Sequence, residues 1–408
     1  MYNINLSTAV AVKGDNAYFS ALYHNALLRM NMQTEKTEYL CSFEKEKKII
    51  GIHGKSFCYK ELVWFIPQYG EYIACYDIDA NKMEYIDVPG KIYGRPCMEK
   101  YCLDNQGERI LPKYSDAGWI DGENIYLVPA ATDTALILNV KTKKISKTFH
   151  LTYHENEYFG CGTYYEGKIW MAPYEGHHLI SLDICTNEIQ RIDCEREQGI
   201  FYGICGYRER IWFSSLTDKG VMFWDIQEKK YGELPCMDMD FKYGKRTYRD
   251  IVKYSDTLWL FPWEAEKIIF LDNEKQLFVE YESKVKQGFG VMLEVDMCKD
   301  SMYAVSYSHN YMICLHKDNF RYEIYTPKIS ISQLYDILNC NHGEEALCML
   351  MEHYHGGMPE KDLGITDYIS LSVLHGLSMN KRSEAEYELK NLTGKIGQAC
   401  FAVMKEEK

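Results

Sequence analysis

The stretch KSFCYKELVWFIPQYGEYIACYDIDANKMEYIDV, residues 55–88, decides the fold. It holds four short runs rich in β-branched and aromatic residues, a composition typical of strands. These runs cover residues 55–59, 62–67, 72–76 and 83–88. Asx residues between the last two runs, at Asp77, Asp79 and Asn81, favour a tight turn because they bond their own backbone. Proline cannot donate to a sheet, so Pro67 marks the end of the second run. The stretch therefore predicts one small antiparallel sheet of four strands.

The same pattern recurs along the chain, with an aromatic residue in each second run. These aromatics are Tyr18, Trp64, Tyr126, Trp170, Trp212, Trp259 and Tyr303. A second column follows thirteen residues after each of them: Asn31, Asp77, Asn139, Asp183, Asp225, Asp272 and His316. Four-strand units at intervals of 42–62 residues are the signature of a β-propeller. A single small sheet cannot bury its own faces, so seven units predict seven blades stacked around a channel.

We expect an all-β protein, a seven-bladed β-propeller of four-stranded antiparallel blades, over residues 1–328. The first unit has its own inner strand, Ile4 to Val12, and the last has its own outer strand, Arg321 to Tyr325. Closure of the ring therefore does not require a strand swapped between the two ends. After Pro327 the apolar residues take helical spacing, which predicts a small α-helical appendage over residues 329–408.

Composition and charge exclude several classes of protein. The 408 residues include 46 Lys+Arg and 59 Asp+Glu, a net charge of −13 that repels the phosphates of nucleic acids. No apolar run approaches the ~20 residues needed to cross a bilayer, so we expect no membrane insertion. The 15 cysteines form no CxxC pair, and the N-terminus has no basic segment of a signal peptide. These features predict reduced thiols and a cytoplasmic protein.

The units resemble the repeats of Kelch, YncE-like and streptogramin-lyase-like propellers over residues 4–327. The resemblance rests on an aromatic strand, a polar loop, a strand ending in Asp and a turn such as Lys141-Thr142-Lys143-Lys144. Kelch's paired glycines are missing, and the Trp-Asp dipeptide of WD40 repeats occurs once, at Trp224-Asp225. The chain is also similar to uncharacterised bacterial propellers with a helical tail. The lyase resemblance implies a Mg²⁺ site at one end of the disc, where Glu175, His177 and Glu264 fall in loops.

Several short motifs imitate functional sites without completing them. Gly54-Lys55-Ser56 looks like the end of a P-loop, but Ile49 stands where that loop needs glycine. A calcium loop starting at Asp77 fails because Lys82 and Val88 replace the required Gly and Glu. The GxSxG, HExxH and GxGxxG patterns do not occur. The sequence thus predicts no metal site and no cofactor, and it leaves the catalytic residues, if the chain has any, unknown.

A candidate binding face follows from propeller geometry. Loops just past each aromatic strand gather at one end of the disc, together with the connections between blades, two of which are long (Pro89–Ser115 and Leu234–Asp250). Aromatic planes suit sugars and peptides, and arginines suit a carboxylate or phosphate. The candidate ligand-binding residues are Tyr23, His24, Asn25, Tyr69, Asp133, Tyr174, Glu175, His177, Trp263, Glu264, His309, Asn310, Arg95, Arg246 and Arg249.

These features favour a non-enzymatic recognition or scaffold protein that binds a protein, peptide or glycan on this face. One alternative is a lyase- or hydrolase-like enzyme at the channel mouth. Such an enzyme needs at least two titratable groups with perturbed pKa values in one pocket. Another alternative is a structural subunit that assembles through its C-terminal helices.

Overall fold

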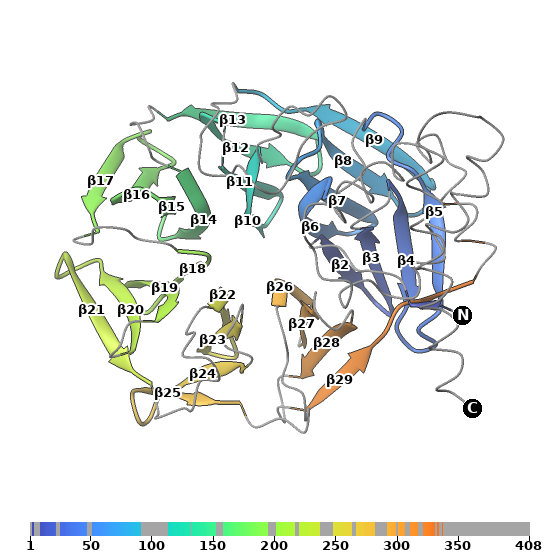
Figure 1. Cartoon of the computed structure of the whole chain (residues 1–408). Coiled ribbons are helices and arrows are strands. Elements are labelled where there is room, and N and C mark those ends of the chain that lie inside the picture. The colour runs from blue at the N-terminus through green and yellow to red at the C-terminus, as the bar shows by residue number, and fades with distance from the viewer. Residues whose placement is uncertain are drawn as a thin grey trace, which may run out of the picture.

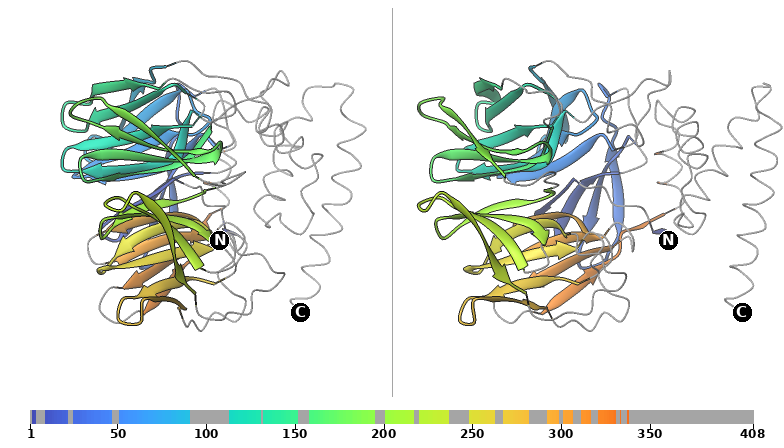
Figure 2. Two further views of the ribbon diagram at one scale, coloured as in Figure 1. Left: turned by 90° about the vertical axis from the view of Figure 1, so that its left-hand side faces the viewer. Right: turned by 60° about the vertical axis from the view of Figure 1, so that its left-hand side comes forward.

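The computed structural model contains seven four-stranded antiparallel blades around a central channel (Figure 1). In every blade the strands follow chain order from the channel outward. Figure 2 shows the ring of blades from two further sides. The structure describes residues 2–3, 9–21, 25–46, 51–90, 113–130, 132–151, 158–194, 201–216, 220–236, 248–262, 267–281, 292–298, 301–306, 311–316 and 321–330, together with Gln333 and Ile337. The predicted all-β propeller fold is confirmed.

The two inner strands of each blade, in blade order, are β2 (Val10–Lys13) and β3 (Asn16–Ser20), β6 (His53–Tyr59) and β7 (Leu62–Pro67), β10 (Tyr114–Asp121) and β11 (Asn124–Pro129), β14 (Tyr158–Tyr165) and β15 (Lys168–Glu175), β18 (Ile204–Tyr207) and β19 (Arg210–Leu216), β22 (Tyr248–Tyr254) and β23 (Thr257–Pro262), and β26 (Met292–Cys298) and β27 (Ser301–Ser306). The two outer strands are β4 (Leu27–Asn31) and β5 (Thr37–Cys41), β8 (Tyr72–Asp77) and β9 (Lys82–Asp87), β12 (Thr134–Asn139) and β13 (Lys144–His150), β16 (His178–Asp183) and β17 (Ile189–Asp193), β20 (Gly220–Asp225) and β21 (Lys230–Pro235), β24 (Ile269–Asp272) and β25 (Leu277–Glu280), and β28 (Tyr311–His316) and β29 (Tyr322–Tyr325). A separate short pair is formed by β1 (Tyr2–Asn3) and β30 (Lys328–Ile329).

The aromatic column lies in the second strand of every blade, as the repeat predicts. Trp64, Trp212 and Trp259 are at most 2% exposed. The buried apolar side chains form clusters that each join two neighbouring blades, including one between the first blade and the last. A single blade cannot bury its own apolar faces, and in the ring each sheet covers the apolar face of the next.

The Asx column forms the turn between the third and fourth strands. The Asp77 carboxylate accepts hydrogen bonds from the N–H groups of Asp79 (3.1 Å) and Ala80 (2.9 Å). Four residues after the column the backbone turns left-handed, with φ of 49° at Asn81 and 51° at Lys229. Asx residues at the turn start supply the bonds that hold such turns closed. The column is therefore structural, and the resemblance to a calcium loop at Asp77 is explained by turn formation.

The ring closes without a swapped strand, as expected. Inner strand β2 of the first blade contacts inner strand β26 of the last, and every blade is one continuous segment. The described part of the first inner strand is Val10–Lys13, and residues 4–8 of the predicted strand lie outside the described residues.

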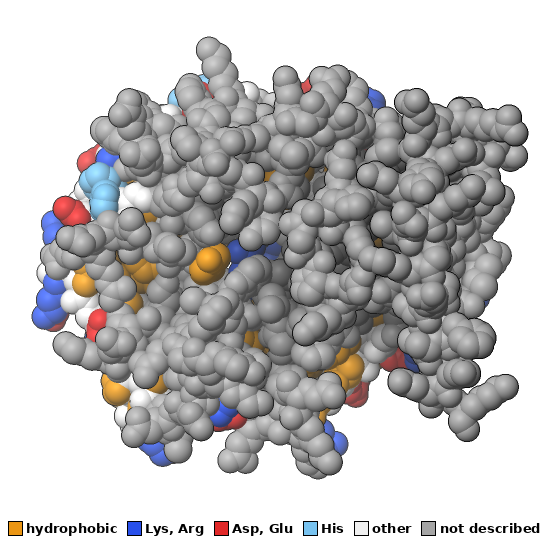
Figure 3. Space-filling model, viewed as in Figure 1, with side chains coloured by type: hydrophobic (Ala, Val, Ile, Leu, Met, Phe, Trp, Pro, Cys, Tyr) orange, Lys and Arg blue, Asp and Glu red, His pale blue; other side chains and the backbone are white. Residues whose placement is uncertain are grey.

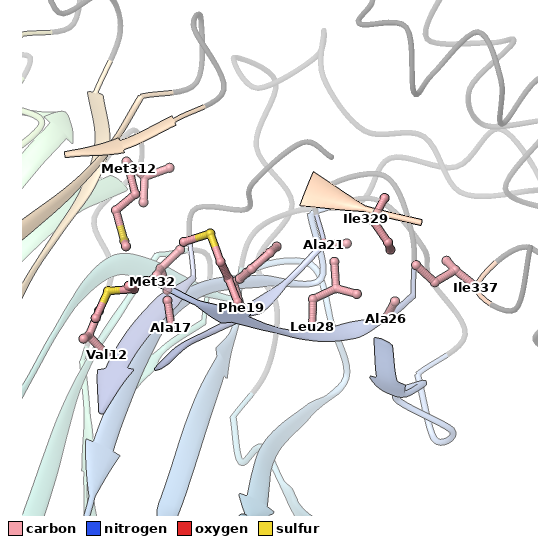
Figure 4. Close-up of a cluster of buried hydrophobic side chains, with 13 residues drawn as sticks. Val12, Ala17, Phe19, Ala21, Ala26, Leu28, Met32, Met312, Ile329 and Ile337 are labelled. Carbon is pink, nitrogen blue, oxygen red and sulfur yellow. The ribbon is translucent and has the colours of Figure 1, made fainter. Parts of the chain in front are cut away.

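A clasp formed by the short strands β1 and β30 lies at the outer edge of the first blade. Strand β30 pairs with β1 and forms a bridge to Lys36. The Lys328 N–H donates to the Glu35 carbonyl (3.0 Å), and its side chain forms an ion pair with the Glu35 carboxylate. Ile329 (0% exposed) and Ile337 (3%) join the apolar cluster of the first blade, where they lie near Ala21 and Ala26 (Figure 4). The first residues of the predicted appendage thus pack onto the propeller.

Replacing Ile329 with alanine is expected to lower the free energy of unfolding by about 2 kcal/mol. This value is the low end of the usual range for truncating a buried aliphatic side chain, because the edge of the ring can relax. Equilibrium denaturation with urea measures the change. Ile324→Ala is the matched control, since Ile324 is 40% exposed and should lose less than about 0.5 kcal/mol. Equal losses in the two variants would contradict a role for Ile329 in the clasp.

Residues beyond Ile337, where the helical appendage is predicted, lie outside the described residues. Within the described ranges, no helix has the length and apolar character required to span a bilayer.

Candidate functional site

A cavity of about 410 Å³ occupies the central channel, and its described walls come from the inner strands of six blades. Figure 3 shows Lys or Arg side chains beside hydrophobic ones at the centre of the disc. Glycines let the inner strands approach one another closely. A Cβ added at Gly203, the residue before β18, would lie 2.9 Å from the Arg249 carbonyl oxygen and 2.9 Å from the Asp250 Cα, so the backbone there packs directly against β22.

A β-bulge positions Arg249 in the channel wall. Tyr248 pairs with Pro262 and Asp250 pairs with Phe261, which leaves Arg249 as the extra residue of the bulge. Bulges of this kind re-aim side chains beside functional sites. The guanidinium lies 5.7 Å from the centroid of the Tyr202 ring, within cation–π range. Protein surrounds this side chain, although it retains surface facing the cavity.

The equivalent bulge in the second blade precedes Lys55. His53 pairs with Pro67 and Lys55 with Ile66, so Gly54 is the extra residue. Lys55 is 9% exposed, and its ammonium donates to the Val295 carbonyl (3.1 Å) in β26 of the seventh blade. The Lys55 side chain therefore links the second blade to the seventh, which are not neighbours in the ring. The Gly-Lys-Ser motif lies inside strand β6, which agrees with the rejection of a P-loop.

Burial and neighbouring charges shift the pKa values at this point of the channel. Burial raises the pKa of Asp250, whereas Lys55, the Ile251 N–H and Arg249 lower it. Burial lowers the pKa of Arg249, opposed by Asp250 and Tyr69. Lys55, Arg249 and Asp250 thus act on one another in one cavity. Lys253 also lines the wall, so the described lining residues include three cations and one carboxylate.

The other part of the cavity wall is apolar and aromatic. Trp119 and Tyr164 line it, and the Tyr126 ring packs nearly parallel to both. Two thiols also belong to the wall. Burial raises the pKa of Cys205 to about 12 and that of Cys161 well above its usual value, so neither is a ready nucleophile. Every cysteine whose side chain is described is a free thiol, as predicted.

Of the predicted site residues, the structure brings Tyr69 and Arg249 together. Tyr69 lies in the turn between β7 and β8, close enough to Arg249 to raise its pKa. The sequence prediction placed Arg249 in a connection between blades, whereas it lies inside inner strand β22. The reason is that β22 starts at Tyr248, at the end of the predicted long connection, so its first residues face the channel.

The other described candidates lie elsewhere. Asn25 is 3% exposed and holds a turn, since its amide donates to the carbonyls of Phe43 (3.1 Å) and Glu46 (3.3 Å). Asp133 accepts from the Thr134 hydroxyl (2.8 Å), and His177 is exposed in the turn before β16. Tyr174 and Glu175 end strand β15, and their side chains lie outside the described part. The remaining candidates lie wholly outside it: Tyr23, His24, Arg95, Arg246, Trp263, Glu264, His309 and Asn310.

Sequence reasoning missed the channel residues, although the repeat marks them. Lys55, Gly203 and Asp250 each stand nine residues before the aromatic of their blade, and Tyr202 and Arg249 stand ten before. In the part of the chain that the structure describes, no group of three His, Cys, Asp or Glu side chains could hold a metal ion. The Glu175, His177 and Glu264 set that the lyase resemblance implies is not wholly within that part.

No protein-family model matches this sequence, and no curated protein matches it. Solved structures do match. The computationally designed Ika8 protein aligns over 79% of this chain and 87% of its own, at 9% identity and a TM-score of 0.50. PorZ, an essential bacterial surface component of the type-IX secretion system of Porphyromonas gingivalis, aligns over 81% of this chain and 39% of its own, at 11% identity and a TM-score of 0.52. The likeness is one of fold. Function has to come from the site itself.

Proposed function

We propose that this chain is a non-enzymatic recognition protein that binds an acidic segment of a protein or peptide partner at the Arg249 end of its channel. The observation that carries the proposal is that Lys55, Arg249 and Lys253 line one cavity together with Asp250, the one carboxylate among its described lining residues. Planar guanidinium groups match carboxylates with two parallel hydrogen bonds. Tyr69 and Tyr202 add aromatic surface beside the guanidinium.

The position of Lys55 and Arg249 inside the channel favours a role in ligand binding over a role as solvated surface charges. A surface arginine is screened by water and salt, whereas a cation inside a channel interacts through a lower dielectric. The net charge of −13 repels an acidic partner at long range. We therefore expect that added salt, which screens the repulsion more than the buried contact, weakens binding little.

Arg249→Met is expected to weaken binding of an acidic peptide at least tenfold, because it removes the fork that would hold the carboxylate. The probe is an array of heptapeptides carrying Asp or Glu, each paired with the same peptide carrying Asn or Gln. Peptides selected on the array are then measured by fluorescence anisotropy. We expect the acidic member of each pair to bind more tightly to the wild-type chain.

The control variant is Arg208→Met, which removes the same charge from an exposed arginine paired with Asp256. It should bind like the wild type. Equal binding of acidic and amide peptides, an equal loss in both variants, or no binding peptide at all would each contradict the proposal. A neutral glycan ligand would reveal itself by binding Arg249→Met as tightly as the wild type.

A second candidate function is favoured by one observation, the raised pKa of Asp250 beside two cations. A buried carboxyl of this kind suits general acid–base chemistry at a channel mouth. In a lyase- or hydrolase-like enzyme, Asp250→Asn would abolish turnover and leave ligand affinity nearly unchanged. In a recognition protein, the same substitution would change affinity alone.

A further inference from the structure

Two tyrosines on the outer strands of the second blade (Figure 1) hold a cation between their rings. Tyr72 begins β8 and Tyr85 lies in β9, and their ring centroids are 5.8 Å apart with planes 72° from parallel. The Lys45 ammonium nitrogen lies 5.5 Å from the centroid of each ring. Both distances are within cation–π range. The two rings therefore form two walls of an aromatic site, here called the tyrosine cage, and Lys45 occupies it.

The backbone that carries Lys45 is fixed to the second blade, whereas the Lys45 side chain is exposed. Glu46 is 1% exposed, and its carboxylate accepts hydrogen bonds from the N–H groups of Glu71 (2.7 Å) and Tyr72 (2.8 Å). Burial raises the pKa of Tyr85 to about 12, and the Lys45 N–H lowers it, which places the Tyr85 hydroxyl beside this backbone. The Lys45 side chain can therefore leave the tyrosine cage while both rings stay in place.

Few contacts hold the Lys45 side chain in the tyrosine cage. Within the part of the chain that the structure describes, its ammonium forms no ion pair and no side-chain hydrogen bond besides the two ring contacts. Cation–π contacts of an exposed ammonium are weak, because water solvates the charge as well. A lysine side chain of another protein can make the same two contacts, so it would compete with Lys45 directly.

We propose that the tyrosine cage binds a lysine side chain from a basic segment of a partner protein, and that Lys45 is its autoinhibitory occupant. Asp87 pairs with Tyr72 across β8 and β9 and follows Tyr85 by two residues, so its carboxylate lies on the same face of the blade as both rings. The net charge of −13 also attracts a basic segment at long range. The tyrosine cage lies on outer strands, so this contact is additional to the one proposed in the channel.

An NMR titration that observes a peptide in the presence of the full chain tests this inference. The probe is a heptapeptide with blocked ends, one central lysine, and glycine and serine elsewhere. The matched probe carries Nε-acetyllysine, which is neutral. Aromatic rings shift the ε-methylene protons of a lysine bound over their faces upfield, and the dependence of the shift on concentration gives the dissociation constant. We expect the lysine peptide to bind at least tenfold more tightly than the acetyllysine peptide.

Two variants locate the peptide in the tyrosine cage. Lys45→Met should tighten binding of the lysine peptide at least threefold, because a site that its own side chain occupies is open for only a fraction of the time. Tyr72→Leu should weaken binding at least tenfold and remove the upfield shift. The matched controls are Lys60→Met and Tyr59→Leu, since the Lys60 ammonium lies 5.4 Å from the centroid of one ring, that of Tyr59. Both controls should bind like the wild type.

Equal binding of the two peptides, no binding of either peptide, or binding without an upfield shift would overturn this inference. An unchanged affinity in Lys45→Met would also overturn it, because the peptide would then not compete with Lys45. The measurement on Lys45→Met leaves both rings in place, and circular dichroism melts show whether each variant is folded. Acidic peptides test the channel separately, so the failure of either proposal leaves the other standing.

Discussion

Acidification from pH 6.5 to pH 3 is expected to remove about 4 kcal/mol of the free energy of unfolding through a single imidazole, that of His53. His53 is 0% exposed, and its ring lies 4.4 Å from the Phe43 ring and 5.5 Å from the Phe65 ring, centroid to centroid. One ring nitrogen, Nδ1, lies 3.1 Å from the Ser20 hydroxyl. Burial lowers the pKa of this imidazole from 6.5 to about 3.

The sign of the effect follows from which state binds the proton more tightly. The unfolded chain protonates His53 near pH 6.5, whereas the folded chain resists until about pH 3. The stability is therefore complete above pH 6.5 and declines as the pH falls toward 3. Urea denaturation across this range measures the decline.

Matched variants isolate the contribution of His53. His53→Phe, which keeps a ring between Phe43 and Phe65, should flatten the decline between pH 6.5 and pH 3. His177→Gln, which removes an exposed imidazole, should keep the wild-type profile. Glu46 and Asp250 act in the opposite direction, because burial raises their pKa values and protonation then favours the fold. They are present in all three proteins and cancel from the comparison. Parallel profiles for wild type and His53→Phe would contradict the expectation.

The fold could be predicted because local and tertiary signals coincide in each repeat. Asp77 fixes a turn by bonding the backbone two and three residues ahead, and Trp64 fills the space between two blades. Side-chain bonds of the same kind hold the turns at Asn31, Asn139, Asp183, Asp225 and Asp272, so this requirement appears as a column in the sequence. One local feature differs between blades. Strand β7 ends at Pro67, whereas β15 continues past Pro173 to Glu175, because β14 pairs with it as far as the Tyr158–Glu175 pair.

The candidate site was harder to predict because it depends on contacts between distant blades. Lys55 donates to Val295, 240 residues away in sequence, and no local pattern encodes that bond. Arg249 faces the channel because of a bulge, which shifts the strand alternation by one residue. Sequence reasoning concentrated on loops, where function is usually found. The charged residues that line the channel instead stand nine residues (Lys55, Asp250) or ten residues (Arg249) before the aromatic residue of their blade.

Trp212→Ala is expected to lower the free energy of unfolding by about 3–5 kcal/mol, the range for truncating a fully buried aromatic side chain. Trp212 is 2% exposed, and its ring packs 4.8 Å from Phe223 within its own blade and 5.9 Å from Phe278 in the next. Its indole N–H donates to the Tyr207 carbonyl (3.1 Å). Truncation opens a cavity between two rigid sheets that cannot collapse, because each is held by its other neighbour.

Tyr303→Ala tests whether burial, rather than membership of the repeat column, sets this loss. Tyr303 occupies the equivalent position in the last blade but is only partly buried, so its truncation should be less costly than that of Trp212. Urea denaturation followed by both tryptophan fluorescence and circular dichroism gives the two values. A loss below about 1 kcal/mol for Trp212→Ala would mean that blade-to-blade packing does not depend on the aromatic column. If Tyr303→Ala lowered the free energy of unfolding as much as Trp212→Ala, the contribution of an aromatic residue in this column would not depend on the area that it buries.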